Sequence, residues 1–119
     1  MNKLIILLIT TLTLFACSSG KTTTISRVVD GDTFDVQYGS GDIDRIRLLG
    51  VDTPETYSKN KPDEYEGVTN IECLDEWGDK ATTYAIDILA SNPVVLTPDP
   101  LTEERDYYDR LLSYIEFEG

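Results

Sequence analysis

The sequence predicts a mainly β domain with one helix, an α+β architecture. Two β-type runs and a longer apolar run follow one another in the first half of the chain, separated by glycine-containing turns. A pattern with helical periodicity comes next, and two short β-type runs follow it. Three strands, a helix and two strands is the element order of an OB-type five-stranded barrel with its helix between strands 3 and 4. The chain of 119 residues has room for one such domain.

The first three strands are predicted from composition and turn signals. Residues 21–29 are rich in Thr, Ile and Val, and residues 33–38 alternate apolar with polar side chains. The turn between them is at residues 30–32. A second turn at residues 39–42 leads into residues 43–51, whose apolar side chains, Ile43 and Val51 among them, indicate a well-buried third strand.

A helix is predicted from Trp77 onward, with Asp75 as its N-cap, after an exposed loop at residues 56–72. Residues 91–93 end the helix, and short strands are expected at 94–97 and 111–117. The apolar residues that fall on one face of this helix are Trp77, Ala81, Tyr84, Ala85, Ile88 and Leu89.

The N-terminal segment, residues 1–17, has the pattern of a bacterial secretion signal. A lysine precedes an apolar run that is too short to span a membrane, which takes about 20 apolar residues. The run ends in Leu-Phe-Ala-Cys17, which resembles the lipobox of lipoproteins, where the cysteine is acylated and becomes the mature N-terminus. We therefore expect an exported lipoprotein, anchored to a membrane through lipid on Cys17 and facing the periplasm or the cell exterior. Residues 18–24 are the tether and 25–119 the domain; an ordinary cleaved signal peptide is the alternative.

The composition restricts the chemistry that the chain can perform. It has no histidine, which excludes a Ser-His-Asp triad and histidine-ligated zinc. If Cys17 carries lipid, Cys73 is the only other thiol, so an intramolecular disulfide is excluded. The net charge of −12 disfavours binding of a polyanion through a broad basic surface. Catalysis must therefore use carboxylates, arginines and a hard metal ion at a local site.

Four carboxylates stand at predicted junctions between strands and loops: Asp30, Asp32, Asp52 and Glu55. Carboxylates at strand ends can converge on one point, and such oxygen ligands select calcium or magnesium. The spacing leaves a second interpretation open, in which these aspartates only form turns. An EF-hand is excluded, because the third ligand position is Phe34.

Two arginines extend this set. Arg47 lies in an apolar strand five residues before Asp52, and Arg110 begins the last strand. An arginine at the end of an apolar strand needs a partner, either an anionic ligand or a structural aspartate. Arg45 lies on the same face of the strand as Arg47, so the spacing alone does not show which of the two arginines belongs to the site.

Four motifs, in this order and spacing, resemble the staphylococcal nuclease family. They are Asp-Gly-Asp-Thr at 30–33, Arg-Leu-Leu-Gly-Val-Asp-Thr-Pro-Glu at 47–55, Trp-Gly-Asp-Lys-Ala at 77–81 and Tyr-Asp-Arg-Leu-Leu-Ser-Tyr-Ile at 108–115. The first two, with the later arginine, are specific to that family. The resemblance covers residues 25–119.

The resemblance implies a calcium-dependent phosphodiesterase that hydrolyses DNA or RNA and acts as a monomer. It implies calcium ligation by the carboxylates of Asp32 and Asp52 and by the backbone carbonyl of Thr53. The catalytic residues that it implies are Glu55, as general base, and Arg47 and Arg110, as phosphate ligands.

The chain departs from the family pattern in two ways. Asp109 stands where the family usually has glycine, which adds a negative charge next to Arg110. The family domain also normally continues past the fifth strand into helices that cover the open side of the barrel, and here these C-terminal helices are missing. We therefore expect residues 18–119 alone to be poorly folded and weakly active, and the gene to continue beyond Gly119 or to have been cut short.

Two other functions are compatible with the sequence. The first is a catalytically inactive OB module that binds single-stranded nucleic acid by stacking bases on Tyr57, Tyr65, Tyr107 or Tyr108. The second is an adaptor lipoprotein in which the barrel is only a spacer. The joint presence of the carboxylates and arginines named above favours chemistry over binding alone.

Overall fold

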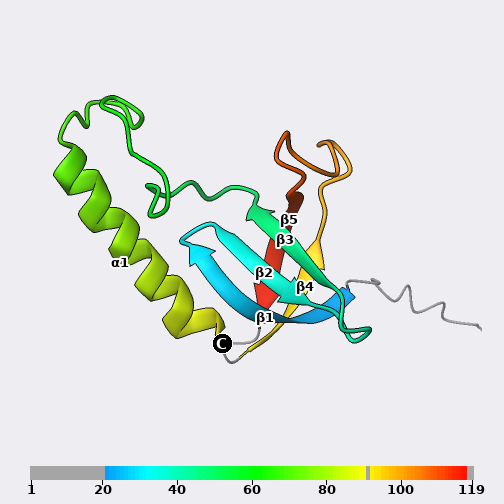
Figure 1. Ribbon diagram of the computed structural model, residues 1–119. Coiled ribbons are helices and arrows are strands. Elements are labelled where there is room, and N and C mark those ends of the chain that lie inside the picture. The colour runs from blue at the N-terminus through cyan, green and yellow to red at the C-terminus, as the bar shows by residue number, and fades with distance from the viewer. Residues whose placement is uncertain (1–20, 91, 118–119) are drawn as a thin grey trace, which may run out of the picture.

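The computed structural model describes residues 21–90 and 92–117 (Figure 1). Its strands close into a barrel in the order β1-β2-β3-β5-β4, with the helix between the third and fourth strands, so the predicted OB-type barrel is confirmed. The elements are β1 (Lys21–Asp30), β2 (Thr33–Gln37), β3 (Ile43–Leu48), α1 (Ile71–Leu89), β4 (Pro93–Thr97) and β5 (Leu111–Phe117).

The N-terminal predictions fall mostly outside the described residues. The signal segment and Cys17 lie there, and so does the first part of the predicted tether. Residues 21–24, the rest of that tether, form the beginning of β1 and pair with β4. Among the described residues, no helix combines the length and the apolar composition that crossing a membrane requires.

The pairing of β3 with β5 closes the barrel. All other neighbouring strands are antiparallel, whereas β3 and β5 are parallel, with Ile46 opposite Leu111 and Leu48 opposite Ser113. In Figure 1 the end of β3 and the beginning of β5 lie next to each other at the same rim. This closure places the segment before β5 beside the loop that follows β3, although the two are far apart in the sequence.

The barrel interior is filled by apolar side chains from the strands and from α1. Phe34, Val36, Ile46 and Val94 are completely buried. Phe34 and Val94 pack with residues near the C-terminal end of α1, while Val36 and Ile46 pack with β4. Burial of this apolar area is the main term that stabilises the small domain.

The helix begins earlier than predicted. It starts at Ile71, and its N-cap is Asn70, whose side-chain oxygen accepts a hydrogen bond from the Cys73 N–H at 3.2 Å. The prediction of Asp75 as the N-cap is wrong, because the Asp75 carboxylate instead accepts a hydrogen bond from Asn60. The predicted exposed loop therefore ends at residue 70.

The buried face of α1 also differs from the predicted one. Leu74, Gly78, Ala85 and Leu89 are buried, whereas Trp77 is 57% and Tyr84 67% exposed. Of the predicted face, Ala85 and Leu89 are buried and Ala81 and Ile88 half-buried, so the prediction is correct toward the C-terminal end of the helix and wrong for Trp77 and Tyr84.

The third strand is shorter and less buried than predicted. It ends at Leu48, and Ile43 is 62% and Val51 44% exposed. Ile43 pairs with Gln37 at the far end of the β2–β3 ladder. Val51 follows Gly50, whose φ of +77° turns the chain away from the sheet. Only Ile46 in this strand is completely buried.

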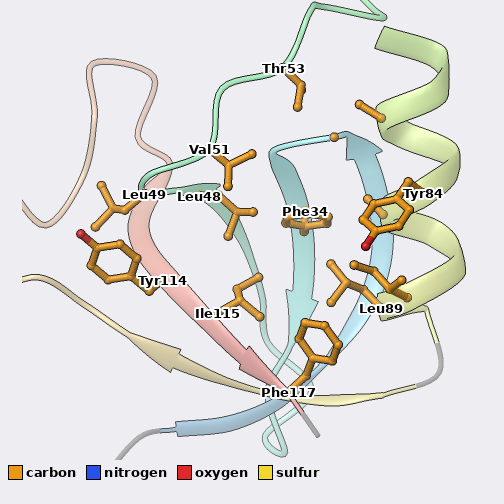
Figure 2. A pocket seen from close by; sticks show the side chains of 14 residues that line it. Phe34, Leu48, Leu49, Val51, Thr53, Tyr84, Leu89, Tyr114, Ile115 and Phe117 are labelled. Atoms are coloured by element: carbon orange, nitrogen blue, oxygen red, sulfur yellow. The ribbon is translucent and has the colours of Figure 1, made fainter. Parts of the chain in front are cut away.

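An apolar groove of about 410 Å³ lies between α1 and the β3–β5 side of the barrel. Figure 2 shows Phe34, Leu48 and Ile115 pointing into it, with Phe117 at one end. Ile88 also lines the groove. Ile88 and Ile115 are half-buried where they line this groove.

Candidate active site

The predicted site residues gather at the barrel rim where β3 ends and β5 begins. The turn between β1 and β2 joins this rim because the Leu48 N–H donates a hydrogen bond to the Asp32 carbonyl at 2.8 Å. The loop after β3 and the segment before β5 complete the site (Figure 1). Three segments that are distant in the sequence are therefore positioned by the barrel closure.

Asp32 is the buried centre of the site. Its Oδ2 accepts hydrogen bonds from the Thr53 N–H at 2.8 Å and from the Thr53 hydroxyl at 3.2 Å. Its Oδ1 accepts one from the Thr33 hydroxyl at 3.0 Å. Asp32 is only 4% exposed, so these bonds replace the water that the carboxylate loses on burial.

Arg47 holds the two predicted metal-binding carboxylates together. Its guanidinium lies 3.0 Å from Asp32 Oδ2 and 2.5 Å from Asp52 Oδ1, and it also donates to the Val51 carbonyl at 2.8 Å. The Asp52 side chain is 69% exposed, against 6% for Asp32. The structural Arg–Asp pair that the sequence left open is therefore present, and an anionic ligand of Arg47 would replace the exposed Asp52 first.

Arg110 is oriented toward the same site by Asp106. Its Nε and its backbone N–H donate to the Asp106 carboxylate at 2.7 and 2.9 Å, and its Nη1 contacts the Thr33 hydroxyl at 3.3 Å. Burial pushes the pKa of Asp106 upward, but the hydrogen bonds and charge of Arg110 outweigh it, so the pKa lies below 3.8. Asp106 therefore stays ionised and keeps Arg110 in place.

Glu55 and Arg110 face one hollow. A pocket of about 310 Å³ is lined by Glu55, Ser58, Tyr108 and Arg110. The guanidinium carbon of Arg110 lies 5.4 Å from the centre of the Tyr108 ring. A carboxylate, a cation and an exposed aromatic ring thus line the same cavity.

The backbone of Glu55 is held by Asn60, a residue that the sequence analysis did not single out. The Glu55 N–H donates to Asn60 Oδ1 at 2.8 Å, and Asn60 Nδ2 donates to the Glu55 carbonyl at 2.9 Å and to Asp75 at 2.8 Å. Asn60 is 4% exposed. Its sequence context of turn-forming residues carried no signal of this role, which depends on long-range contacts.

The structure separates Arg45 from the site. Its guanidinium binds both carboxylate oxygens of Asp35, at 2.7 and 3.1 Å. Arg47 lies two residue pairs closer to the rim, opposite Thr33. Of the two arginines on this face, only Arg47 therefore reaches Asp32 and Asp52.

The field at this rim is negative. Burial and the neighbouring charge of Asp32 raise the pKa of Asp30 from 3.8 to about 6. Burial, together with the charges of Asp52 and Asp32, raises the pKa of the Tyr65 phenol to about 12. Burial is the first cause of both shifts and the nearby carboxylates add to it, so an added cation at this rim would lower both pKa values.

The donors at the rim are compatible with a hard cation that keeps much of its hydration. Asp32, Asp52 and Thr53 offer oxygen atoms only, which suit calcium or magnesium. Within residues 21–90 and 92–117, no group of three or more His, Cys, Asp or Glu side chains is close enough to hold a metal ion. A site with two protein carboxylates therefore fits the ion as a weak, water-rich site.

Comparison with known proteins decides the family. Residues 45–119, more than half of the chain, match the family model described as "Staphylococcal nuclease homologue". The chain belongs to the staphylococcal nuclease family. The match includes Arg47, Asp52, Glu55 and Arg110 and ends beyond β5.

Relatives of this nuclease-family chain occur in bacteria and archaea. It is 41% identical over 96 residues to an uncharacterised protein of Methanocaldococcus jannaschii, covering 76% of this chain and 46% of that protein. It is 34% identical over 96 residues to an SPbeta prophage-derived endonuclease of Bacillus subtilis, covering 81% and 28%. It is 33% identical over 96 residues to the thermonuclease of Staphylococcus intermedius, covering 81% and 49%. The chain thus spans less than half the length of each of these relatives.

Proposed function

We propose that this chain is a calcium-dependent phosphodiesterase that hydrolyses DNA or RNA outside the cytoplasm. The observation that carries the proposal is the shared pocket of Glu55 and Arg110, beside the Asp32–Arg47–Asp52 cluster. The printed names of two relatives, an endonuclease and a thermonuclease, support the same reaction class.

The two arginines supply the electrostatic part of the reaction. A phosphodiester is anionic, and its transition state concentrates more charge on the non-bridging oxygens. Guanidinium groups fixed before the reaction stabilise that charge without further reorganisation. Asp106 fixes Arg110, and the carbonyl of Val51 with Asp32 fixes Arg47.

Glu55 supplies the general base. Glu55 lines the pocket that also contains Arg110. A water held there can lose its proton to Glu55 as it attacks the phosphorus, while the bond from phosphorus to the leaving ester oxygen breaks and that oxygen takes up a proton. Asn60 fixes the Glu55 backbone on one side, and α1 lies against it at Gly78 on the other. A general base needs this fixed position, because small displacements lower the rate steeply.

Calcium would be held by Asp32, Asp52 and Thr53. When bound, the ion would polarise a phosphate oxygen and offset charge in the transition state. The N-terminal lipoprotein pattern supports an exported protein, with Cys17 as the lipid anchor, and weak calcium sites suffice outside the cell. The charges of Asp52 and Asp32, which add to burial in raising the pKa of Tyr65, favour a cation at this rim.

The proposal is tested by incubating the purified chain with single-stranded DNA and RNA in calcium and in chelator. We expect acid-soluble nucleotides to be released with calcium, and release to stop when the chelator is added. Equal release with and without chelator would rule out the calcium requirement, and no release from either nucleic acid would rule out the nuclease.

An inactive nucleic-acid-binding module is the second candidate. It is favoured by the exposure of Tyr57, Tyr107 and Tyr108, which are 71%, 96% and 74% exposed and could each stack on a base. In that case single-stranded DNA would raise the melting temperature without being cleaved. An adaptor whose barrel is only a spacer would neither cleave single-stranded DNA nor change its melting temperature when the DNA is added.

A further inference from the structure

We propose that Arg27 and Tyr57 form a second nucleotide subsite beside the pocket of Glu55 and Arg110. It would bind the phosphate and base of a single strand that extends away from the scissile bond. The nucleic-acid nature of the ligand rests on the proposed function.

Tyr57 is placed next to the pocket by the loop that carries Glu55. Residues 55 and 58 line the pocket, and Tyr57 lies between them in the chain with its side chain 71% exposed. The Thr56 hydroxyl contacts the Val29 carbonyl at 3.5 Å, which ties this loop to the end of β1. The ring therefore faces solvent beside the strand that carries Arg27.

Arg27 is the one arginine in the described part of the chain that makes no ion pair with a carboxylate. The carboxylate opposite it in the β1–β2 ladder belongs to Asp35, which is bound at both oxygens by Arg45. Arg47, Arg105 and Arg110 are each paired as well. In a chain with a net charge of −12, an arginine free of acidic partners is available to an anionic ligand.

Arg27 and Tyr57 repeat an arrangement already present in the pocket. The Arg27 guanidinium carbon lies 5.8 Å from the centre of the Tyr57 ring, and the corresponding distance from Arg110 to Tyr108 is 5.4 Å. An aromatic ring for a base and a cation for the adjoining phosphate are the usual parts of a single-strand site. Two such pairs on neighbouring segments fit successive nucleotides.

The two pairs lie on the same face of the sheet. Arg27 is opposite Asp35 on β2, and Thr33, two residues earlier on that strand, contacts Arg110. Side chains two residues apart on a strand point to the same side and are separated by about 7 Å. A strand leaving the pocket can therefore reach Arg27 without crossing the barrel.

The test measures binding of fluorescein-labelled oligothymidylates of two and eight nucleotides to the full chain, in chelator at low salt. We expect the eight-nucleotide strand to bind more tightly. Arg27→Ala and Tyr57→Ala should each raise the dissociation constant of the eight-nucleotide strand about 10-fold, because the loss of one stacked base or one phosphate contact weakens binding by about this factor. The dissociation constant of the two-nucleotide ligand should change by less than about two-fold. Tyr57→Phe should restore binding because it keeps the ring.

Lys80→Ala is the matched control. Lys80 also lies over an aromatic ring, that of Trp77, but it is paired with Glu76 on the exposed side of α1. Its removal changes the total charge as Arg27→Ala does and should leave binding unchanged. The subsite is refuted if Arg27→Ala and Tyr57→Ala bind the longer strand like Lys80→Ala, or if wild type shows no preference for it. Because cleavage is not needed, an absence of calcium-dependent hydrolysis would count against the proposed function alone.

Discussion

At the scale of single residues, the side chains of Asp32, Arg47 and Arg110 are each held by defined neighbours. Asp32 is enclosed by Thr33, Thr53 and Arg47, while Arg110 is anchored on Asp106. The exposed Asp52 completes the cluster. Two other aspartates near this rim, Asp109 and Asp30, lead to testable consequences.

Asp109 adopts a φ of +63°, in the left-handed region that glycine occupies without strain. Asp109→Gly should raise the free energy of unfolding by about 1 kcal/mol relative to Asp109→Asn, because Asn keeps a Cβ in that conformation. Both variants remove a negative charge beside Arg110, so kcat/KM should rise at low salt. The rise should be only about two-fold, because the Asp109 side chain is 88% exposed and its charge is screened by solvent. Chemical denaturation and initial rates measure the two effects. An Asn variant with wild-type kcat/KM at low salt would show that this charge does not reach the substrate.

The raised pKa of Asp30 predicts a pH-dependent stability. Between its ordinary value of 3.8 and the folded value of about 6, the folded chain retains a proton that the unfolded chain has lost. The free energy of unfolding therefore falls as pH rises through this window. Asp30→Asn removes the ionisation and keeps an oxygen for the Asp32 N–H, which Asp30 accepts at 3.3 Å.

We expect Asp30→Asn to be more stable than wild type by about 1–3 kcal/mol at pH 7.5 in chelator, and by about half as much at pH 5. Urea denaturation at the two pH values measures the difference. A stability difference that does not change with pH would show that the carboxylate is not titrating in this window.

At the scale of elements, α1 controls the position of Glu55 through a glycine. A Cβ on Gly78 would lie 2.9 Å from the Pro54 carbonyl oxygen and 3.1 Å from that of Glu55. These are backbone atoms, which cannot move aside as a flexible side chain could. The helix and the loop that carries Glu55 are therefore packed as one unit.

Gly78→Ala should lower the free energy of unfolding by about 1–3 kcal/mol, although alanine favours helix by about 1 kcal/mol, because overpacking against backbone outweighs the propensity. It should also lower kcat more than it raises KM, since the general base is displaced. Gly39→Ala is the control, because a Cβ there meets nothing within 4 Å. The packing argument fails if Gly78→Ala is as stable and as active as Gly39→Ala.

The type and order of the elements could be predicted from the sequence, because two-residue alternation and glycine turns are local signals. The beginning of α1 could not, since Asn70 is embedded in turn-forming composition. The cluster of Asp32, Arg47 and Asp52 was predicted as a set, and the structure brings these residues into contact. The roles of Asn60 and Gly78 could not be predicted, although Gly78 lies in one of the four motifs, because each acts only through residues that folding places next to it.

At the scale of the whole molecule, the charge opposes the proposed ligand. The net charge of −12 repels a polyanion, while the attraction is confined to a few arginines at one rim. Such a surface differs from the broad basic face of most nucleic-acid-binding proteins.

Rising salt should therefore leave kcat/KM unchanged or raise it at first, because long-range repulsion is screened beyond about 10 Å at 0.1 M. Initial rates on single-stranded DNA, at fixed calcium and salt from about 0.02 to 0.2 M, provide the measurement. A steep, monotonic fall of kcat/KM from the lowest salt upward would show that local attraction by arginine and calcium outweighs the long-range repulsion by the net charge.

The turnover of Glu55→Gln on single-stranded DNA or RNA with saturating calcium tests the central claim most directly. The substitution keeps the size of the side chain and removes the base, so kcat should fall by more than about 100-fold while the melting temperature changes little. Arg110→Ala should show a comparable loss through the transition state. A loss of less than about 10-fold in both variants, or roughly 1.4 kcal/mol of barrier, would contradict the assignment of this rim as the active site.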